Sequence, residues 1–301
     1  MFSPLQKENL KVVITDSGLG GLSVHALLDK HLRSYQNTPN IELIFFNSLA
    51  DHSLGYNVMK TEAQKLQLFN IALKSMLNLN PDIILIACNT LSALYGKTKV
   101  SRSIKIPVIS IIDLGIDMVQ ESIANNLNEK IIIFGTETTI KSNQHKQQII
   151  RKGVSEDKII TQACENLESE IQINPSSKKV DELIDMNVTE ALANVGNSSE
   201  SITAVLACTH YGYSYSIFKE KLANKFNGQI KILNPNEKMG SIVKLDNLNK
   251  KSNSITNKVI SRVDITKSEM ININLLLEKD SPNVAKALEN YTFDPNLFKI
   301  D

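Results

Sequence analysis

Two stretches of this 301-residue chain share one pattern: IILIACNTLSAL at residues 83–94 and AVLACTHYGYS at residues 204–214. Each is an apolar run that ends in Ala-Cys and continues into small polar residues. Such a run predicts a buried parallel strand, a tight turn and the start of a helix. Cys88 and Cys208 would lie at these turns. In open α/β sheets ligands bind outside the carboxyl ends of the strands, so both thiols are expected where chemistry takes place.

Strand and helix patterns alternate along most of the chain. We expect strands at residues 12–15, 41–47, 106–113, 131–135 and 158–164, and helices at 61–79, 115–127, 180–195 and 273–291. The helix at 61–79 ends before Pro81, as the missing N–H of proline requires. The alternation predicts an α/β fold whose mostly parallel sheets are covered by helices.

The second half of the chain repeats the layout of the first. Asp16, after the opening strand, precedes Cys88 by 72 positions, and Thr136, after the strand at 131–135, precedes Cys208 by the same 72. Equal spacing between matched turns predicts two similar domains, related by pseudo-two-fold symmetry, with the active site in the cleft between them. The expected domains are residues 1–110 with 225–301, which hold Cys88, and residues 111–224, which hold Cys208.

Composition excludes several classes of protein. Apolar residues make up 42 % of the chain and charged residues 22 %, which is typical of a folded, soluble protein. A formal net charge of +1 gives no electrostatic basis for binding nucleic acid or an anionic membrane. Three cysteines and five histidines show no disulfide framework and no paired spacing for a metal. We expect a cytoplasmic protein with no metal site, and the sequence leaves open a homodimer.

The two repeated cysteines are better candidates for chemistry than the third. A free thiol has a pKa of about 8.5, and a helix N-terminus supplies up to about 2 kcal/mol toward its ionisation, so the turn by itself could suffice to lower the thiol pKa toward 7. A lone buried cysteine packs as a small hydrophobe, and Cys164 in TQACENL is interpreted in this way. The turns also carry hydroxyl and amide groups beside the thiols: Asn89, Thr90 and Thr209.

Asp16 and His210 are candidate partners of the thiols. Asp16 opens DSGLGGLS, where an acidic residue is also a common helix N-cap. The glycines of this turn imitate a GxGxxG dinucleotide motif imperfectly, with Ser23 at the third glycine, so a dinucleotide site is a rival interpretation. His210 follows Cys208 by two positions and could either hand protons to and from its sulfur or form a structural hydrogen bond.

Two thiols on opposite faces of one small ligand suit the inversion of a stereocentre. One thiolate removes a proton from one face and the other thiol returns a proton to the opposite face, so the two titrate as a coupled pair. The chain shows no lysine signature for pyridoxal phosphate, so no cofactor is expected and the enclosed site itself would stabilise the carbanion. A single-cysteine hydrolase or decarboxylase and a non-enzymatic dicarboxylate-binding protein remain alternatives.

The same residues resemble glutamate racemase and the wider aspartate/glutamate racemase superfamily. Four motifs over residues 10–240 carry the resemblance: DSGLGGLSV, ACNTLSA, GTETTIKS and ACTHY. The resemblance implies that Cys88 and Cys208 transfer the proton with help from Asp16 and His210, and that the substrate is a small acidic amino acid, glutamate, converted to D-glutamate for peptidoglycan. It also implies a set of substrate-binding residues: Ser17, Tyr56, Asn57, Asn89, Thr90, Thr136, Thr139 and Thr209.

The chain departs from the family pattern in the loops that would hold the ligand. LGYN at residues 54–57 replaces a PYG segment, and Gly212 with Tyr213 replaces the usual Pro-Leu after CTHY. Gln172 stands where the family closes its segment with a glutamate. These departures leave the two thiols in place but leave aspartate and other acidic amino acids open as substrates.

Overall fold

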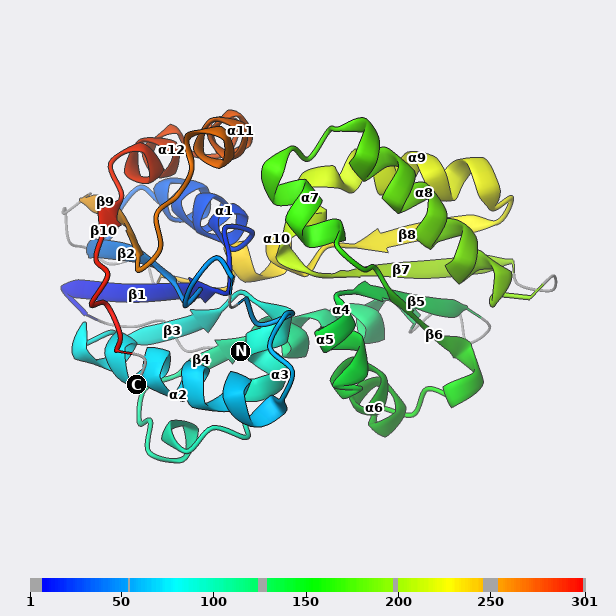
Figure 1. Cartoon of the computed structure of the whole chain (residues 1–301), viewed down its shortest axis with the longest axis horizontal. Helices are drawn as coiled ribbons and strands as arrows, with labels where there is room; N and C mark the ends of the chain where they lie inside the picture. Colours follow the sequence, from blue (N-terminus) through cyan, green and yellow to red (C-terminus); the bar gives the residue numbers. More distant parts are fainter. Residues whose placement is uncertain (1–6, 54, 124–128, 197–199, 246–253, 300–301) are drawn as a thin grey trace. The chain divides into compact units, whose positions relative to one another are not determined.

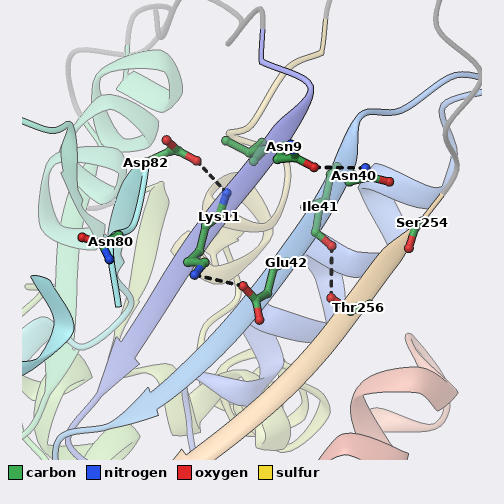
Figure 2. Close-up of a pocket in the computed structure, with 10 residues that line it drawn as sticks. Asn9, Lys11, Asn40, Ile41, Glu42, Asn80, Asp82, Ser254 and Thr256 are labelled. Carbon is green, nitrogen blue, oxygen red and sulfur yellow. Dashed lines mark hydrogen bonds and ion pairs between the residues drawn. The ribbon is translucent and has the colours of Figure 1, made fainter. Parts of the chain in front are cut away.

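A computed structural model describes residues 7–53, 55–123, 129–196, 200–245 and 254–299. The chain divides into two compact units, Met1–Ile111 with Asn236–Asp301, and Ile112–Pro235 (Figure 1). Among the described residues, no helix combines the length and apolar character needed to cross a lipid bilayer.

The first unit contains a six-stranded sheet in the order β10-β9-β2-β1-β3-β4. Every strand pairs in parallel with its neighbours. The strands are β1 (Asn9–Asp16), β2 (Asn40–Asn47), β3 (Ile83–Ile86), β4 (Val108–Ser110), β9 (Ile255–Ser261) and β10 (Thr292–Phe293). The helices are α1 (Leu22–Arg33), α2 (Glu62–Asn78), α3 (Asn89–Tyr95), η1 (Val100–Arg102), α10 (Pro235–Gly240, whose first residue belongs to the second unit), α11 (Lys267–Leu277) and α12 (Pro282–Glu289).

Helices cover both faces of this sheet: α1, α11 and α12 lie on one side, and α2 and α3 on the other (Figure 1). The face toward α2 and α3 forms a continuous core in which Val13, Ile84 and Ile86 pack with Phe69 and Leu73. Helix α2 begins at a capping box: the Thr61 side chain accepts the backbone N–H of Gln64, whose side chain accepts the N–H of Thr61.

A buried polar network ties α1 to the C-terminal segment. The carboxylate of Asp29 accepts hydrogen bonds from Arg33, Asn257 and Ser281. Asn257 in turn pairs with Nε2 of His25, which is fully buried. We call these five residues the Asp29 network. It links α1, β9 and the first residue before α12, so the C-terminal segment is anchored by polar contacts as well as by strand pairing.

The second unit contains a four-stranded sheet in the order β6-β5-β7-β8, again with parallel pairing throughout. The strands are β5 (Lys130–Gly135), β6 (Ile159–Ala163), β7 (Ser201–Ala207) and β8 (Gln229–Leu233). The helices are α4 (Ile111–Ile123, which starts at the last residue of the first unit), α5 (Glu137–Lys141), α6 (Gln144–Arg151), η2 (Glu156–Lys158), α7 (Leu167–Ile173), α8 (Lys178–Ala193), η3 (Thr209–Ser214) and α9 (Tyr215–Lys225).

The core of the second unit lies between its sheet and helices α7, α8 and α9. Ile132, Phe134 and Leu206 from the strands pack with Val188 and Phe218 from the helices. Figure 1 shows α5 and α6 on the other side of this sheet.

The predicted α/β fold with parallel sheets is confirmed, and the repeat has a structural counterpart. The order β2-β1-β3-β4 in the first sheet matches β6-β5-β7-β8 in the second. Asp16, the last residue of β1, and Thr136, directly after β5, therefore lie at the ends of equivalent strands, and Cys88 and Cys208 follow the equivalent strands β3 and β7.

Three local predictions differ from the structure. Residues 111–113 open helix α4 instead of ending a strand, because β4 pairs with β3 only as far as Ser110. Residues 273–291 form two helices, because Ser281 caps a new helix whose first residue, Pro282, has no N–H to continue the previous one. β8 pairs with β7, so the second sheet extends beyond residue 224, where we expected the return to the first domain. The predicted helix at 115–127 is observed to Ile123, and residues 124–127 lie outside the described residues.

Candidate active site

The first unit gathers predicted site residues at the carboxyl edge of its sheet. Thr15 pairs with Ile86 in register, so Asp16 and Cys88 emerge from adjacent strands at the same edge. Cys88 caps helix α3, and its Sγ accepts the backbone N–H of Leu91 at 3.5 Å. The hydroxyl of Ser17 lies 3.1 Å from the same sulfur, and Oδ1 of Asp16 accepts the N–H of Ser17 at 2.5 Å.

The thiol of Cys88 is harder to ionise than the sequence suggested. Burial raises its pKa to about 12, and the carboxylate of Asp16 adds to the rise, while hydrogen bonds from Ser17 and Leu91 oppose it. The turn alone therefore does not bring this pKa toward 7. The Cys88 side chain is only 5 % exposed, so burial destabilises its thiolate by more than the N-terminus of the short helix α3 stabilises it.

Tyr56 places a hydroxyl beside this thiol. Its side chain is 2 % exposed, and its OH has no hydrogen-bond partner among the described residues. Burial raises the pKa of Tyr56 well above 10, and the Cys88 sulfur contributes to the rise, so the two groups are close. A buried donor without a partner is costly, which makes the Tyr56 hydroxyl a candidate to bind a ligand. Asp16, Ser17, Tyr56 and Cys88 form what we call the Cys88 cluster.

Three other predicted residues flank this cluster. Asn89 and Thr90 are buried in the first turn of α3, directly after Cys88. Asn57 follows Tyr56 in the segment between β2 and α2, while Leu54 of the same LGYN sequence lies outside the described residues.

The glycine turn between β1 and α1 has a packing role that the dinucleotide interpretation did not foresee. A Cβ on Gly21 would lie 2.8 Å from Cβ of Asp16 and 3.1 Å from the Phe45 ring. Glycine at this position therefore makes room for the Asp16 side chain, which folds back over the start of α1.

The second unit presents its own group at the equivalent edge. Cys208 follows β7 and is 7 % exposed. Its Sγ lies 3.8 Å from Nδ1 of His210, and Nε2 of the same ring lies 3.0 Å from Oε1 of Gln172. Cys208, His210 and Gln172 form what we call the Cys208 cluster. Thr209, between the thiol and the imidazole in sequence, is buried.

The threonine turn lies at the same edge as Cys208, because Gly135 pairs with Ala207. Thr136 caps α5 by accepting the N–H of Thr139 at 3.3 Å, and its hydroxyl donates to that of Thr139 at 3.0 Å. Both side chains are buried. The cap thus fixes both side chains, and Thr136 occupies the position that Asp16 occupies in the first unit.

Cys164 has the surroundings of a structural thiol. It is fully buried, its Sγ donates to the carbonyl of Gln162 at 3.8 Å, and burial raises its pKa. Tyr211 lies nearby, and its buried ring packs against Phe218 with centroids 5.6 Å apart.

Gln172 is the member of these clusters for which we predicted no role. It lies on α7, far from Cys208 along the chain, and only the packing of α7 against η3 brings it to the imidazole. Its replacement of the family glutamate was visible in the sequence, but its partner was not. The structure thus brings some of the predicted residues together: Asp16, Ser17, Tyr56 and Cys88 in one unit, and Cys208 with His210 in the other. The joint action of the two clusters on one ligand stays a prediction.

Solved structures share this fold. A glutamate racemase from Bacillus anthracis superposes with a TM-score of 0.70 at 20 % identity, over 91 % of this chain and 95 % of the other. One from Francisella tularensis, solved in complex with D-glutamate, gives 0.68 at 23 % identity over the same shares. At these identities the likeness shows the fold alone.

Sequence relatives and a family model extend the comparison. A glutamate racemase from Aquifex pyrophilus is 24 % identical over 91 % of this chain and 96 % of its own length. One from Oceanobacillus iheyensis is 28 % identical over 70 % and 71 %. The model of the Asp/Glu/hydantoin racemases matches residues 18–237, which include both cysteine turns. The chain therefore belongs to the Asp/Glu/hydantoin racemase family and is an isomerase that acts on amino acids.

Proposed function

We propose that this protein is a cofactor-independent glutamate racemase in which Cys88 and Cys208 act on opposite faces of Cα. The observation that carries the proposal is the pair of cysteine clusters. Each lies at the carboxyl edge of a parallel sheet, directly after the strand that occupies the same place in the strand order. Because both units carry a cysteine after the equivalent strand, the chain has the two proton-transfer groups that inversion of Cα requires.

The reaction balances with the chain's own groups. One cysteine, as thiolate, takes the Cα proton, and the C–H electron pair remains on the substrate as a carbanion conjugated with its carboxylate. The other cysteine, as thiol, gives its proton to the opposite face and becomes the thiolate. The protein thus ends each turnover with the proton on the other sulfur, ready for the reverse reaction.

The pKa of Cys88 indicates when its thiolate forms. A pKa of about 12 makes ionisation at pH 7 cost about 7 kcal/mol. A helix end offsets at most about 2 kcal/mol of this, so the substrate has to supply the rest. The α-ammonium of a bound amino acid is a cation that favours the thiolate and counters Asp16. We therefore propose that Cys88 rests as a thiol and ionises only in the substrate complex, where its S–H bond breaks, the proton passes to the Asp16 carboxylate and the electron pair stays on sulfur.

Glutamate is the substrate best supported by the relatives. The proteins described above are named glutamate racemases, and one of the solved structures holds D-glutamate. In the Cys88 cluster the unpartnered hydroxyl of Tyr56 and the hydroxyl of Ser17, which lies beside Cys88, offer donors for a substrate carboxylate. By its resemblance to these enzymes, the protein would supply D-glutamate for peptidoglycan.

The test is incubation of the purified protein with L-glutamate in deuterated buffer, with L-aspartate and neutral amino acids in parallel. We expect D-glutamate that carries deuterium at Cα, and slower reaction of aspartate. Absence of both D-glutamate and Cα deuterium would refute the glutamate assignment, and preferential reaction of aspartate would replace it with the nearest alternative.

Cysteine variants separate the racemase from the other candidates. Cys88→Ser and Cys208→Ser should each abolish racemisation, because each removes one of the two proton-transfer groups. Loss in only one variant would point to a single-cysteine hydrolase or decarboxylase. Saturable binding of glutamate without any solvent exchange would point to a dicarboxylate-binding protein.

A further inference from the structure

A hydrogen-bonded relay runs through the Cys208 cluster. Oε1 of Gln172 lies 3.0 Å from Nε2 of His210, whose Nδ1 lies 3.8 Å from Sγ of Cys208. Gln172 occupies the last turn of α7, which Leu167 and Ile171 hold against the core. His210 itself is buried. The glutamine is therefore fixed by packing on one side and by the imidazole on the other.

This geometry favours one position for the proton of the imidazole. An amide oxygen only accepts, so Nε2 of His210 has to donate and must be protonated. A neutral imidazole with a proton on Nε2 has a bare Nδ1, which is an acceptor. The group beside this acceptor is the thiol of Cys208, which can then donate its S–H.

A glutamine differs from a carboxylate in the charge it presents. A carboxylate would stabilise the imidazolium form of His210, whereas the neutral amide gives that form no counter-charge. The neutral amide therefore favours the neutral imidazole, whose Nδ1 can accept the Cys208 proton when the thiol is required as a base.

We propose that Gln172 is a positioning residue that holds His210 in the Nε2–H tautomer, so that the bare Nδ1 accepts the proton of the Cys208 thiol. In this step the S–H bond breaks, an N–H bond forms at Nδ1, and the electron pair stays on sulfur as the thiolate. The inference rests on the proposed function for its catalytic meaning, but the tautomer is a property of the protein itself.

Several other titratable side chains lie on the elements that pack around the His210 ring. Helix α7 carries Glu168 and Glu170, and α9 carries Tyr215, Lys219, Glu220, Lys221 and Lys225, while β7 carries no titratable side chain and η3 adds only Tyr211 and Tyr213. Glu168 is close enough to raise the pKa of Tyr211. A control therefore has to add a charge to this unit away from η3.

The first test reads the tautomer directly, by long-range proton–nitrogen NMR of the full chain labelled with ¹⁵N-histidine. Loss of signals in His210→Gln assigns the ring. We expect a protonated Nε2 and a bare Nδ1 at pH 7 in the wild type, and mixed tautomers in Gln172→Met, which keeps the volume but removes the acceptor. A proton on Nδ1 in the wild type would overturn the proposal, because Gln172 would then present its NH₂ group to the ring.

The second test uses Gln172→Glu. The new carboxylate should raise the pKa of His210 by about 1 to 3 units and shift the acid limb of kcat/KM to higher pH by the same amount. Gln172→Met should lower kcat/KM about 2- to 12-fold, the factor expected for one neutral hydrogen bond, without that shift. Because the two enantiomers have equal free energies, kcat/KM must be the same for L- and D-glutamate at each pH. The pH profile can therefore be measured with either enantiomer as substrate.

Gln147→Glu is the matched control, because Gln147 is exposed on α6 and the substitution adds the same charge to the same unit. We expect its profile to equal that of the wild type. An unshifted acid limb in Gln172→Glu, or an equal shift in Gln147→Glu, would overturn the proposal. A wild type without racemase activity would refute the proposed function, while the NMR pattern would still decide the role of Gln172.

Discussion

Gly21→Ala tests whether the fold positions the Asp16 carboxylate by close packing. The added methyl carbon would lie 2.8 Å from Cβ of Asp16, 3.0 Å from its Oδ2 and 3.1 Å from Cε2 of Phe45. Carbon atoms in good contact are about 3.5–4.0 Å apart, so Asp16 would have to move by roughly 0.7 Å or more. The backbone of β1 cannot shift as a whole, because it pairs with strands on both sides.

The movement should affect activity more than stability. Overpacking of this kind costs about 1–3 kcal/mol. Displacement of a site residue by close to 1 Å can cost about 100-fold in rate, so we expect kcat/KM to fall about 10- to 100-fold while the protein stays folded.

The assay is racemisation of glutamate together with unfolding in guanidinium chloride. Gly96→Ala is the control. Gly96 is the residue at the end of helix α3, its φ is −63°, and no atom lies within 4 Å of the Cβ that alanine would add. We expect that variant to keep wild-type activity and stability within about 0.5 kcal/mol. Wild-type activity in Gly21→Ala, or equal loss in both variants, would refute the reasoning.

Three further predictions concern stability and the thiol environment. Asp29→Asn should destabilise the protein by about 3 kcal/mol or more, because it breaks a buried charged network. Asp280→Asn, which removes an exposed ion pair, should cost less than about 1 kcal/mol, and unfolding in urea measures both variants. Burial lowers the pKa of His25 to about 4, below its unfolded value of about 6.5. Its contribution is therefore complete above pH 6.5 and lost as pH falls toward 4, by about 3 kcal/mol, and His25→Gln should flatten the pH dependence of unfolding over this window. Ser17→Ala removes a hydrogen bond that lowers the pKa of Cys88, so thiol alkylation at Cys88 should need a higher pH than in the wild type; an unchanged alkylation profile would contradict this.

The sheet architecture could be predicted because it follows from local patterns. Apolar runs such as residues 83–87 form buried parallel strands, and the 72-residue spacing corresponds to equivalent strands of two sheets. Residues 111–113 were misjudged because a short apolar run fits a buried strand and a buried helix equally well. Only the pairing of β4 with the four-residue strand β3 decides between them.

The sequence predicted which residues belong to the site better than it predicted their pKa values and contacts. The positions of Asp16 and Cys88 at one sheet edge follow from strand order, but the pKa of Cys88 depends on burial and on the nearby carboxylate. Gln172 reaches His210 through the packing of α7 on η3, a contact between segments with no shared local pattern. Long-range contacts of this kind set the charges and hydrogen bonds around the site residues, and a sequence motif does not reveal them.

The isotopic composition of both enantiomers early in the reaction tests the two-thiol account most directly. The protein is incubated with unlabelled L-glutamate in deuterated buffer, and L- and D-glutamate are separated at a few per cent conversion. If one thiol removes the Cα proton and another returns a solvent-derived deuteron, D-glutamate should carry deuterium while the remaining L-glutamate carries almost none. Deuterium appearing equally early in the remaining L-glutamate, or D-glutamate that keeps the original proton, would contradict the account.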